Sequence, residues 1–197
     1  MNEALDFLKA KDERLASIIE RTTMETIRWS GDIFEDLVSC ILDMQIRYRG
    51  KAVKFNKMKE ALSGATINQN SIYLLEGEKL KSIKMSSQKY NALIFLSTYW
   101  QENNLAFLDW NELENEEIRS LLNKIKGIGN WTVDMILLFT LQRPDVFPQD
   151  DLQLKKAMRK VYEIDESENL KKEMNVIADN WKPFRSTAVL YLLASKK

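Results

Sequence analysis

The sequence has no histidine and only one cysteine, and each shortage excludes a class of active site. Without histidine there is no histidine general base and no histidine-bound zinc. One cysteine can form neither a disulfide framework nor the four-thiolate site of an iron–sulfur cluster. Cys40 stands among apolar residues, so we expect a buried thiol. The sequence therefore predicts a site with no cofactor and no metal centre.

Glycine and proline are also scarce, at six and three in 197 residues, which argues against a β fold with many turns. The length suffices for one or two compact helical lobes with a hydrophobic core. No apolar run approaches the ~18 residues of a membrane span, and the N-terminus, Met-Asn-Glu-Ala, lacks a signal-peptide pattern. We therefore expect an all-α, cytoplasmic protein.

The sequence has no excess of either sign of charge, because 29 basic residues balance 29 acidic ones. A DNA-binding domain is usually basic, so this balance does not by itself favour DNA. The charges are nevertheless segregated along the chain. Residues 121–160 hold seven Lys or Arg and four Asp, a local excess of three, whereas residues 102–117 hold six acids and no base. This polarity permits a nucleic-acid surface in the first of these segments.

Helical periodicity is the main local signal. We expect one or two helices over residues 4–21, a helix capped by Ser30 or Asp32, and another over residues 51–62. Ser86 or Ser87 should cap the helix that carries Tyr90 to Trp100. Asn111 should open a short helix over residues 112–120, and the last helix should span Thr187 to Leu193.

The most informative stretch, residues 121–160, starts with two helical patterns joined by Gly127-Ile128-Gly129. The first pattern runs to Lys126, and the second carries Val133, Ile136, Leu137 and Thr140 at helical spacing. Glycine reaches positive φ without a Cβ penalty and ends a helix easily. A tight turn here would bare backbone N–H groups at the start of the second helix, where the dipole also favours a phosphate. The alternative is plain packing of two helices.

A pair of carboxylates follows this hairpin. Pro148 breaks the chain, and Asp150-Asp151 then stands directly before an amphipathic pattern that includes Leu154 and Met158. Aspartate is a common helix N-cap, so either residue could have a purely structural role.

At this point the residues resemble a known family. Gly-Ile-Gly-x-Trp-Thr at 127–132, followed by Asp-Val-Phe-Pro-x-Asp-Asp-Leu at 145–152, resembles the helix-hairpin-helix (HhH-GPD) DNA glycosylases. The closest branch is that of the alkylated-base enzymes, 3-methyladenine DNA glycosylase II. The resemblance covers roughly residues 30–195. It implies a two-lobe core with an active-site cleft between the lobes. The terminal helices would form one lobe and roughly residues 45–145 the other.

The family's catalytic carboxylate falls on Asp151, and Asp150 is then the expected cap or supporting group. The resemblance implies that the residue at position 131 determines whether the enzyme only removes the base or also nicks the strand. Trp131 stands there, where strand-nicking relatives have lysine, and this implies a monofunctional enzyme. A carboxylate beside the sugar would stabilise an oxocarbenium-like transition state and could activate water. The alternative for Asp151 is a helix cap alone.

The expected base pocket contains Trp131, Met135 and Tyr48, with Phe147 and Trp29 as weaker candidates. The face of a tryptophan ring attracts a cationic base that has been flipped out of the duplex. Trp131, Tyr48, Phe147 and Trp29 could instead be core residues.

The expected DNA contacts are the amides of Gly127, Ile128 and Gly129, together with Lys126 and the wedge residue Gln45. The resemblance places Gln45 in the loop that fills the gap left by the flipped nucleotide. Met44 and Arg47 depart from the family's pattern beside it, and an ordinary helix end is the alternative. Lys155 and Arg159 are further phosphate candidates. The resemblance also implies a monovalent cation against the hairpin carbonyls.

The resemblance implies a monomer that acts on damaged double-stranded DNA in the bacterial cytoplasm or nucleoid. It would hydrolyse the N-glycosidic bond of alkylated purines such as 3-methyladenine and 7-methylguanine. The alternatives are a non-catalytic DNA-binding module and a glycosylase for another damaged or deaminated base.

Overall fold

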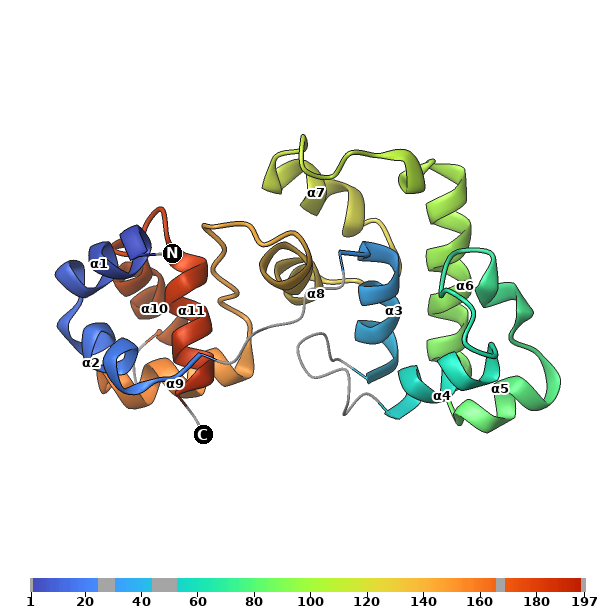
Figure 1. The fold of residues 1–197 in the computed structure, drawn as a ribbon, viewed down its shortest axis with the longest axis horizontal. Coiled ribbons are helices and arrows are strands. Elements are labelled where there is room, and N and C mark those ends of the chain that lie inside the picture. The colour runs from blue at the N-terminus through green and yellow to red at the C-terminus, as the bar shows by residue number, and fades with distance from the viewer. Residues whose placement is uncertain (1, 25–30, 44–52, 166–168, 196–197) are drawn as a thin grey trace. The chain divides into compact units, whose positions relative to one another are not determined.

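The structure, a computed structural model, describes residues 2–24, 31–43, 53–165 and 169–195 (Figure 1). Helices make up all the regular structure in these residues, and no strand occurs among them. The all-α prediction is confirmed. None of the helices in these ranges is long and apolar enough to cross a membrane.

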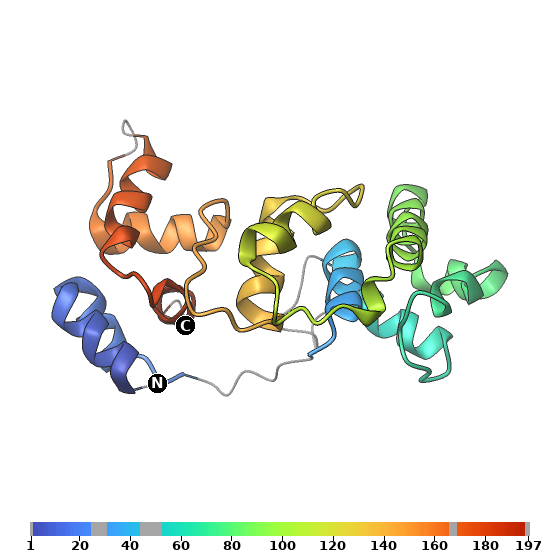
Figure 2. The ribbon, with the colours of Figure 1, turned by 90° about the horizontal axis from the view of Figure 1, so that it is seen from above.

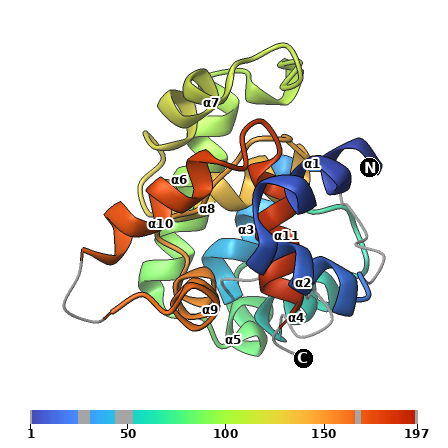
Figure 3. The ribbon, with the colours of Figure 1, turned by 90° about the vertical axis from the view of Figure 1, so that its left-hand side faces the viewer.

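The chain divides into two compact units, which are described separately. The first contains residues 1–27 and 142–197, and the second contains residues 28–141. The helices of the first unit are α1 (Asn2–Lys11), α2 (Glu13–Arg21), α9 (Leu152–Tyr162), α10 (Leu170–Asp179) and α11 (Arg185–Ala194). In this unit α11 packs against α1, α2 and α9, and α10 packs against α9 (Figure 3).

A polar network around Asp12 joins the two ends of the chain in the first unit. The Oδ1 atom of Asp12 accepts a hydrogen bond from the Leu15 amide at 2.9 Å and so caps α2. Its Oδ2 atom accepts from the Tyr162 hydroxyl and from the indole N–H of Trp181, each at 2.8 Å. Trp181 is completely buried. Burial and the neighbouring Asp12 raise the pKa of the Tyr162 hydroxyl. One carboxylate therefore ties α2 to α9 and to the segment after α10.

The second unit contains α3 (Ile33–Asp43), α4 (Val53–Ala61), α5 (Gly77–Ile83), α6 (Ser87–Glu102), α7 (Asn115–Leu122) and α8 (Asn130–Met135). Short helical turns lie at Ser71–Leu74 (η2) and Leu105–Phe107 (η3), and a π-helical segment, η4 (Ile136–Thr140), directly follows α8. α3 packs against α4, α6 and η4 (Figure 2). Phe34 of α3 meets Trp100 of α6 edge to face, with ring centroids 5.3 Å apart.

Most expected helices are present, with two corrections around α7. Asp32 caps α3 and Ser86 caps α6, and each was one of the two caps predicted for its helix. The helix expected from residue 112 begins only at Asn115, because Glu114 and Glu117 form a reciprocal capping box there. It ends at Leu122 rather than at Lys126. α10, capped by Asn169, was not expected from the sequence.

Cys40 is confirmed as a buried thiol, with only 4% of its surface exposed. Burial raises its pKa from 9.0 to about 12. Because the thiolate is the reactive form, a rise of three pKa units should slow labelling about a thousandfold near pH 8. We expect an aromatic disulfide reagent to label Cys40 in denaturant and to be nearly unreactive with the native protein. Fast labelling of the native protein would contradict this burial.

Candidate active site and DNA-binding hairpin

The connection between α7 and α8 is a tight hairpin centred on Gly127. Two successive turns are closed by hydrogen bonds from the Ile125 amide to the Leu122 carbonyl, at 3.0 Å, and from the Ile128 amide to the Ile125 carbonyl, at 2.9 Å. Gly127 has a φ of +94°, a conformation that a residue with a Cβ atom adopts only with strain. Ile125 and Ile128 are both buried and anchor the turn in the second unit.

Several amides at this hairpin, including those of three residues around the glycines, have no acceptor among the described residues. These three residues are Gly127, Gly129 and Asn130, all of which are exposed. Within α8, the Val133 amide is the first that donates to a carbonyl of this turn, that of Gly129, at 3.1 Å. The hairpin thus has the donor geometry expected for a phosphate. The Ile128 amide differs from the expectation, because it already donates to Ile125 within the turn.

Three side-chain contacts that the sequence did not predict hold the hairpin in place. The Tyr99 hydroxyl of α6 donates to the Leu121 carbonyl at 3.2 Å. The side chains of Asn123 and Asn130 are hydrogen bonded across the turn at 2.9 Å. Arg119 of α7 forms an ion pair with the buried Asp134 of α8 at 2.6 Å. Of these three contacts, only the ion pair had a signal in the sequence. Asp134 stands within an apolar helical pattern, and a buried charge requires a partner.

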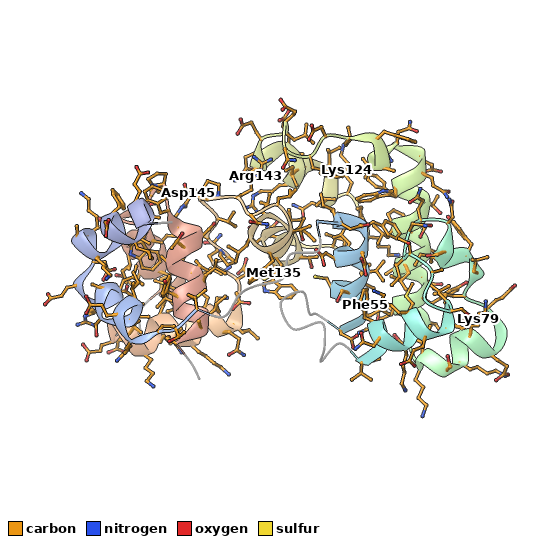
Figure 4. All side chains as sticks on the ribbon, in the orientation of Figure 1. Phe55, Lys79, Lys124, Met135, Arg143 and Asp145 are labelled. Carbon is orange, nitrogen blue, oxygen red and sulfur yellow. The ribbon has the colours of Figure 1, made fainter. Side chains whose placement is uncertain are left out.

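The two pocket candidates on α8 lie one helical turn apart, so they share a helix face. Trp131 is partly exposed, whereas only 5% of Met135 is exposed. Met135 is labelled in Figure 4. Their pocket role stays a prediction. The other candidates, Tyr48, Trp29 and the wedge residue Gln45 with its neighbours Met44 and Arg47, lie outside the described residues.

Lys126 is exposed beside the hairpin glycines, and so is Lys124, which is labelled in Figure 4. Both are therefore accessible to a phosphate group. The contact itself stays a prediction. Among the described residues no group of acids or cysteine could hold a metal ion. The monovalent cation at the hairpin carbonyls also stays a prediction.

Asp151 is the N-cap of α9. Its Oδ1 atom accepts a hydrogen bond from the Leu154 amide at 2.7 Å, and 9% of the residue is exposed. This geometry confirms the structural role that the sequence allowed for Asp151. The catalytic role stays a prediction, since one carboxylate can cap a helix through one oxygen and face a sugar with the other.

The segment that leads to Asp151 is held by the start of α11 within the first unit. The Arg185 side chain donates to both carboxylate oxygens of Asp145, at 2.6 and 2.8 Å. The Ser186 hydroxyl donates to the Arg143 carbonyl at 2.5 Å and accepts from the Val146 amide at 2.9 Å. Figure 4 labels Arg143 and Asp145 on this segment. The sequence Arg-Ser at 185–186 therefore fixes the path of the chain before the candidate catalytic residue.

Nearer to Asp151 the segment is fixed a second time. The Asp151 amide donates to the Pro148 carbonyl at 2.9 Å, and the Asn175 side chain of α10 donates to the Gln149 side chain at 2.8 Å. Asp150 pairs with Lys171 at 2.5 Å and with Lys155 at 3.5 Å. The hydrogen bond from Lys171 is the main reason that the pKa of Asp150 is lowered. These contacts give Asp151 a rigid, well-defined position.

Three expectations around this segment need correction or refinement. Asp150 does not cap α9, because Asp151 occupies the N-cap position, and it instead forms ion pairs. Lys155 is joined to Asp150 and is therefore a poorer phosphate candidate. Phe147 is part of the core, the alternative given for it above, because only 9% of the residue is exposed and its ring lies edge to face on that of Trp181, with centroids 6.1 Å apart. Arg159, the other phosphate candidate, is partly buried.

The similarity of this chain to known proteins agrees with the hairpin and the aspartate. No family model matches the sequence. YfjP of Bacillus subtilis is 33% identical over 121 residues, which cover 61% of this chain and 42% of YfjP. DNA-3-methyladenine glycosylase 1 of Schizosaccharomyces pombe is 28% identical over 168 residues, which cover 83% of this chain and 72% of that protein. The chain thus spans less than half the length of the first relative and about three quarters of the second.

Two solved structures share the fold over almost the whole chain. DNA-3-methyladenine glycosidase from Bacillus halodurans has a TM-score of 0.81 at 25% identity and covers 98% of this chain and 89% of its own. The 3-methyladenine DNA glycosylase Mag1 of Schizosaccharomyces pombe, in complex with abasic DNA, has a TM-score of 0.79 at 25% identity. It covers 97% of this chain and 95% of its own. With this hairpin and this N-capping aspartate, the chain is similar in sequence and in fold to the helix-hairpin-helix DNA glycosylases.

Proposed function

We propose that the protein is a monofunctional DNA glycosylase that removes alkylated purines, such as 3-methyladenine and 7-methylguanine, from duplex DNA. The observation that carries the proposal is Asp151, a carboxylate fixed at the start of α9 by a segment that is bonded to α10 and α11. It follows the hairpin at the spacing found in the glycosylases that this chain resembles.

In this mechanism the target nucleotide is flipped out of the duplex. The bond between the purine nitrogen and the sugar breaks, and its electron pair leaves with the base. The carboxylate of Asp151 stabilises the positive charge that develops on the sugar. Water then attacks the anomeric carbon, and Asp151 accepts its proton. An alkylated purine departs readily because it carries positive charge or is activated, which suits a site without histidine.

Binding to DNA is assigned to the hairpin of the second unit. The exposed amides of Gly127, Gly129 and Asn130 would donate to one backbone phosphate, and such contacts position the protein without reading the base sequence. The similarity to Mag1, which was solved with abasic DNA, supports DNA as the partner. We propose that the protein acts as a monomer where the DNA lies, in the cytoplasm or nucleoid of a bacterial cell.

The proposal is tested with a panel of duplex oligonucleotides, each bearing one alkylated, deaminated or mismatched base. Abasic products are detected as strand breaks after treatment with alkali. We expect release of alkylated purines, strand breaks only after alkali, and no covalent adduct with borohydride, because Trp131 stands where a Schiff-base lysine would be required. Release of a deaminated base alone would reassign the substrate. An adduct trapped by borohydride would overturn the monofunctional assignment.

A second candidate function is a non-catalytic DNA-binding module. The observation that favours it is the capping geometry of Asp151, which is mostly buried and bonded to the Leu154 amide. This candidate predicts binding to duplex DNA with no release from any lesion in the panel.

Trp131 should determine the preference for cationic bases. Contact between a cation and an indole ring contributes about 0.5–2 kcal/mol, so Trp131→Ala should slow release of a cationic lesion about 2- to 30-fold. A neutral lesion should be affected less. The check is the ratio of single-turnover rates for 7-methylguanine and hypoxanthine, with Trp131→Phe as the conservative control. An unchanged ratio would remove Trp131 from the pocket.

The two hairpin glycines should respond differently to alanine. Gly129 has an ordinary φ of −112°, and a Cβ atom added there would meet no atom within 4 Å. Gly129→Ala should therefore keep the stability of the fold but crowd an approaching phosphate. Loss of one charged hydrogen bond of about 1.5 kcal/mol would weaken DNA binding about tenfold.

Gly127→Ala is the contrasting variant, since its φ of +94° is strained for alanine whatever the available space. It should destabilise the fold by about 1–2 kcal/mol. Thermal unfolding and fluorescence anisotropy with a labelled duplex separate the two effects. Wild-type DNA affinity in Gly129→Ala would contradict the assignment of the hairpin to phosphate binding.

A further inference from the structure

A second basic feature lies in the first unit, well separated in sequence from the hairpin. A cavity of about 650 Å³ opens between α2 and α9, both of which pack against α11 (Figure 3). Four basic side chains line it, from Arg14, Arg21, Lys156 and Lys160, against the single acidic side chain of Glu13. We call this feature the α2–α9 groove. The whole chain has no net charge, so this local excess of positive charge points to a function.

Three of the four cations are not neutralised by the described part of the protein. Arg14 donates to the Val161 carbonyl and pairs with Glu163, each at 2.9 Å. Arg21, Lys156 and Lys160 are exposed and have no ion-pair or hydrogen-bond partner among the described residues. Elsewhere in this unit lysines do find partners, as Lys171 does with Asp150. The groove therefore holds three cations that an external anion could neutralise.

The spacing of these cations suits an extended anion. Lys156 and Lys160 are four residues apart on α9, so they emerge on one face of the helix, with Cβ atoms about 5–6 Å apart. Arg21 comes from the last turn of α2 on the opposite wall. A row of charges along an open groove matches a chain of phosphates better than it matches a single carboxylate.

The composition of the groove also limits the ligand. No aromatic ring lines it, and its apolar side chains are only Ala157 and Val161. A site for a free nucleotide would need a surface on which the base can stack. The α2–α9 groove provides charge without such a surface, which is the signature of contact with a sugar–phosphate backbone.

We propose that the α2–α9 groove is a second binding site for the phosphate backbone of duplex DNA, in addition to the hairpin. The choice of DNA as the ligand rests on the proposed function. Arg21, Lys156 and Lys160 would each neutralise a phosphate and release a bound counterion. The hairpin amides carry no charge, so the groove would supply a large share of the salt dependence of binding.

The test compares two triple variants in the full-length protein by anisotropy with an undamaged labelled duplex at several salt concentrations. The first is Arg21→Gln/Lys156→Gln/Lys160→Gln. The matched control is Lys79→Gln/Lys84→Gln/Lys172→Gln, which removes three exposed cations that line neither the groove nor the hairpin. With a contribution of about 0.9 per phosphate, the groove variant should reduce the slope of log K against log salt by ~2–3. The control should leave the slope unchanged.

Other results of this comparison would overturn the proposal or change the ligand assigned to the groove. Equal slopes in the groove variant and the control would overturn the proposal. An unchanged DNA slope, together with loss of binding to inorganic triphosphate or to ATP, would assign the groove to a small anion instead. If no lesion is processed but the slope still falls, the glycosylase proposal fails and the groove remains a DNA site.

Discussion

Asp151→Asn should slow base release about 10²- to 10³-fold while the protein still folds and binds DNA. The carboxylate is the only group to which we assign charge stabilisation at the sugar, and loss of one such electrostatic contact costs about 10²–10³ in rate. Asparagine is as good an N-cap as aspartate, so the bond to the Leu154 amide should persist. The measurement is the single-turnover rate on the best lesion of the panel, alongside thermal unfolding and DNA affinity.

Two control variants separate catalysis from capping. Asp151→Ala loses both roles and should also destabilise the fold by about 1 kcal/mol. Asp150→Asn removes the neighbouring ion pairs with Lys171 and Lys155 but keeps the cap, so it should retain most of the activity. Base release by Asp151→Asn at the wild-type rate would reduce Asp151 to a helix cap and favour the binding-module alternative.

Asp12→Ala should be among the most destabilising single changes in the first unit. It removes the cap of α2, worth about 1 kcal/mol, and leaves two donors without their acceptor. Each unsatisfied buried donor costs about 1–3 kcal/mol, and Trp181 is completely buried. The total loss in the free energy of unfolding is therefore about 3–7 kcal/mol. Denaturant unfolding followed by tryptophan fluorescence measures it as a lower midpoint.

Asp12→Asn is the matched control, because asparagine can cap α2 and still offers one acceptor. Its loss should be clearly smaller than that of Asp12→Ala. Tyr162→Phe removes one donor together with its need for an acceptor and should cost least of the three. A loss below 1 kcal/mol in Asp12→Ala would show that the network does not join the two ends of the chain.

The sequence was sufficient for most of the described helices, though not for α10, and for the spacing of the central motifs. Periodicity located α9 and α11 within a few residues. For α3 and α6 the sequence offered two caps each, and the structure selects Asp32 and Ser86, whereas for α9 it selects Asp151 in place of the expected Asp150. These features depend on local interactions, which a short segment already contains. The hairpin was predictable for the same reason, because one glycine had to adopt positive φ.

The contacts that position the site were not predictable, because they join residues far apart in the chain. Asp12 and Trp181 are separated by 169 positions, and Ser186 reaches Arg143 across 43. The use of the Ile128 amide within the turn depends on the exact end of α7. That end is set by the turns after Leu122, in which the Ile125 and Ile128 amides donate to the Leu122 and Ile125 carbonyls, and periodicity alone does not reveal them.

The most direct measurement is the chemical identity of the product. Wild-type protein in excess over a duplex that contains one 7-methylguanine is incubated, and the reaction is analysed by mass spectrometry without alkali. Our account predicts free 7-methylguanine together with a full-length strand that has lost the base and gained the elements of water. An unchanged duplex, with no free base from this lesion or from any other in the panel, would contradict it.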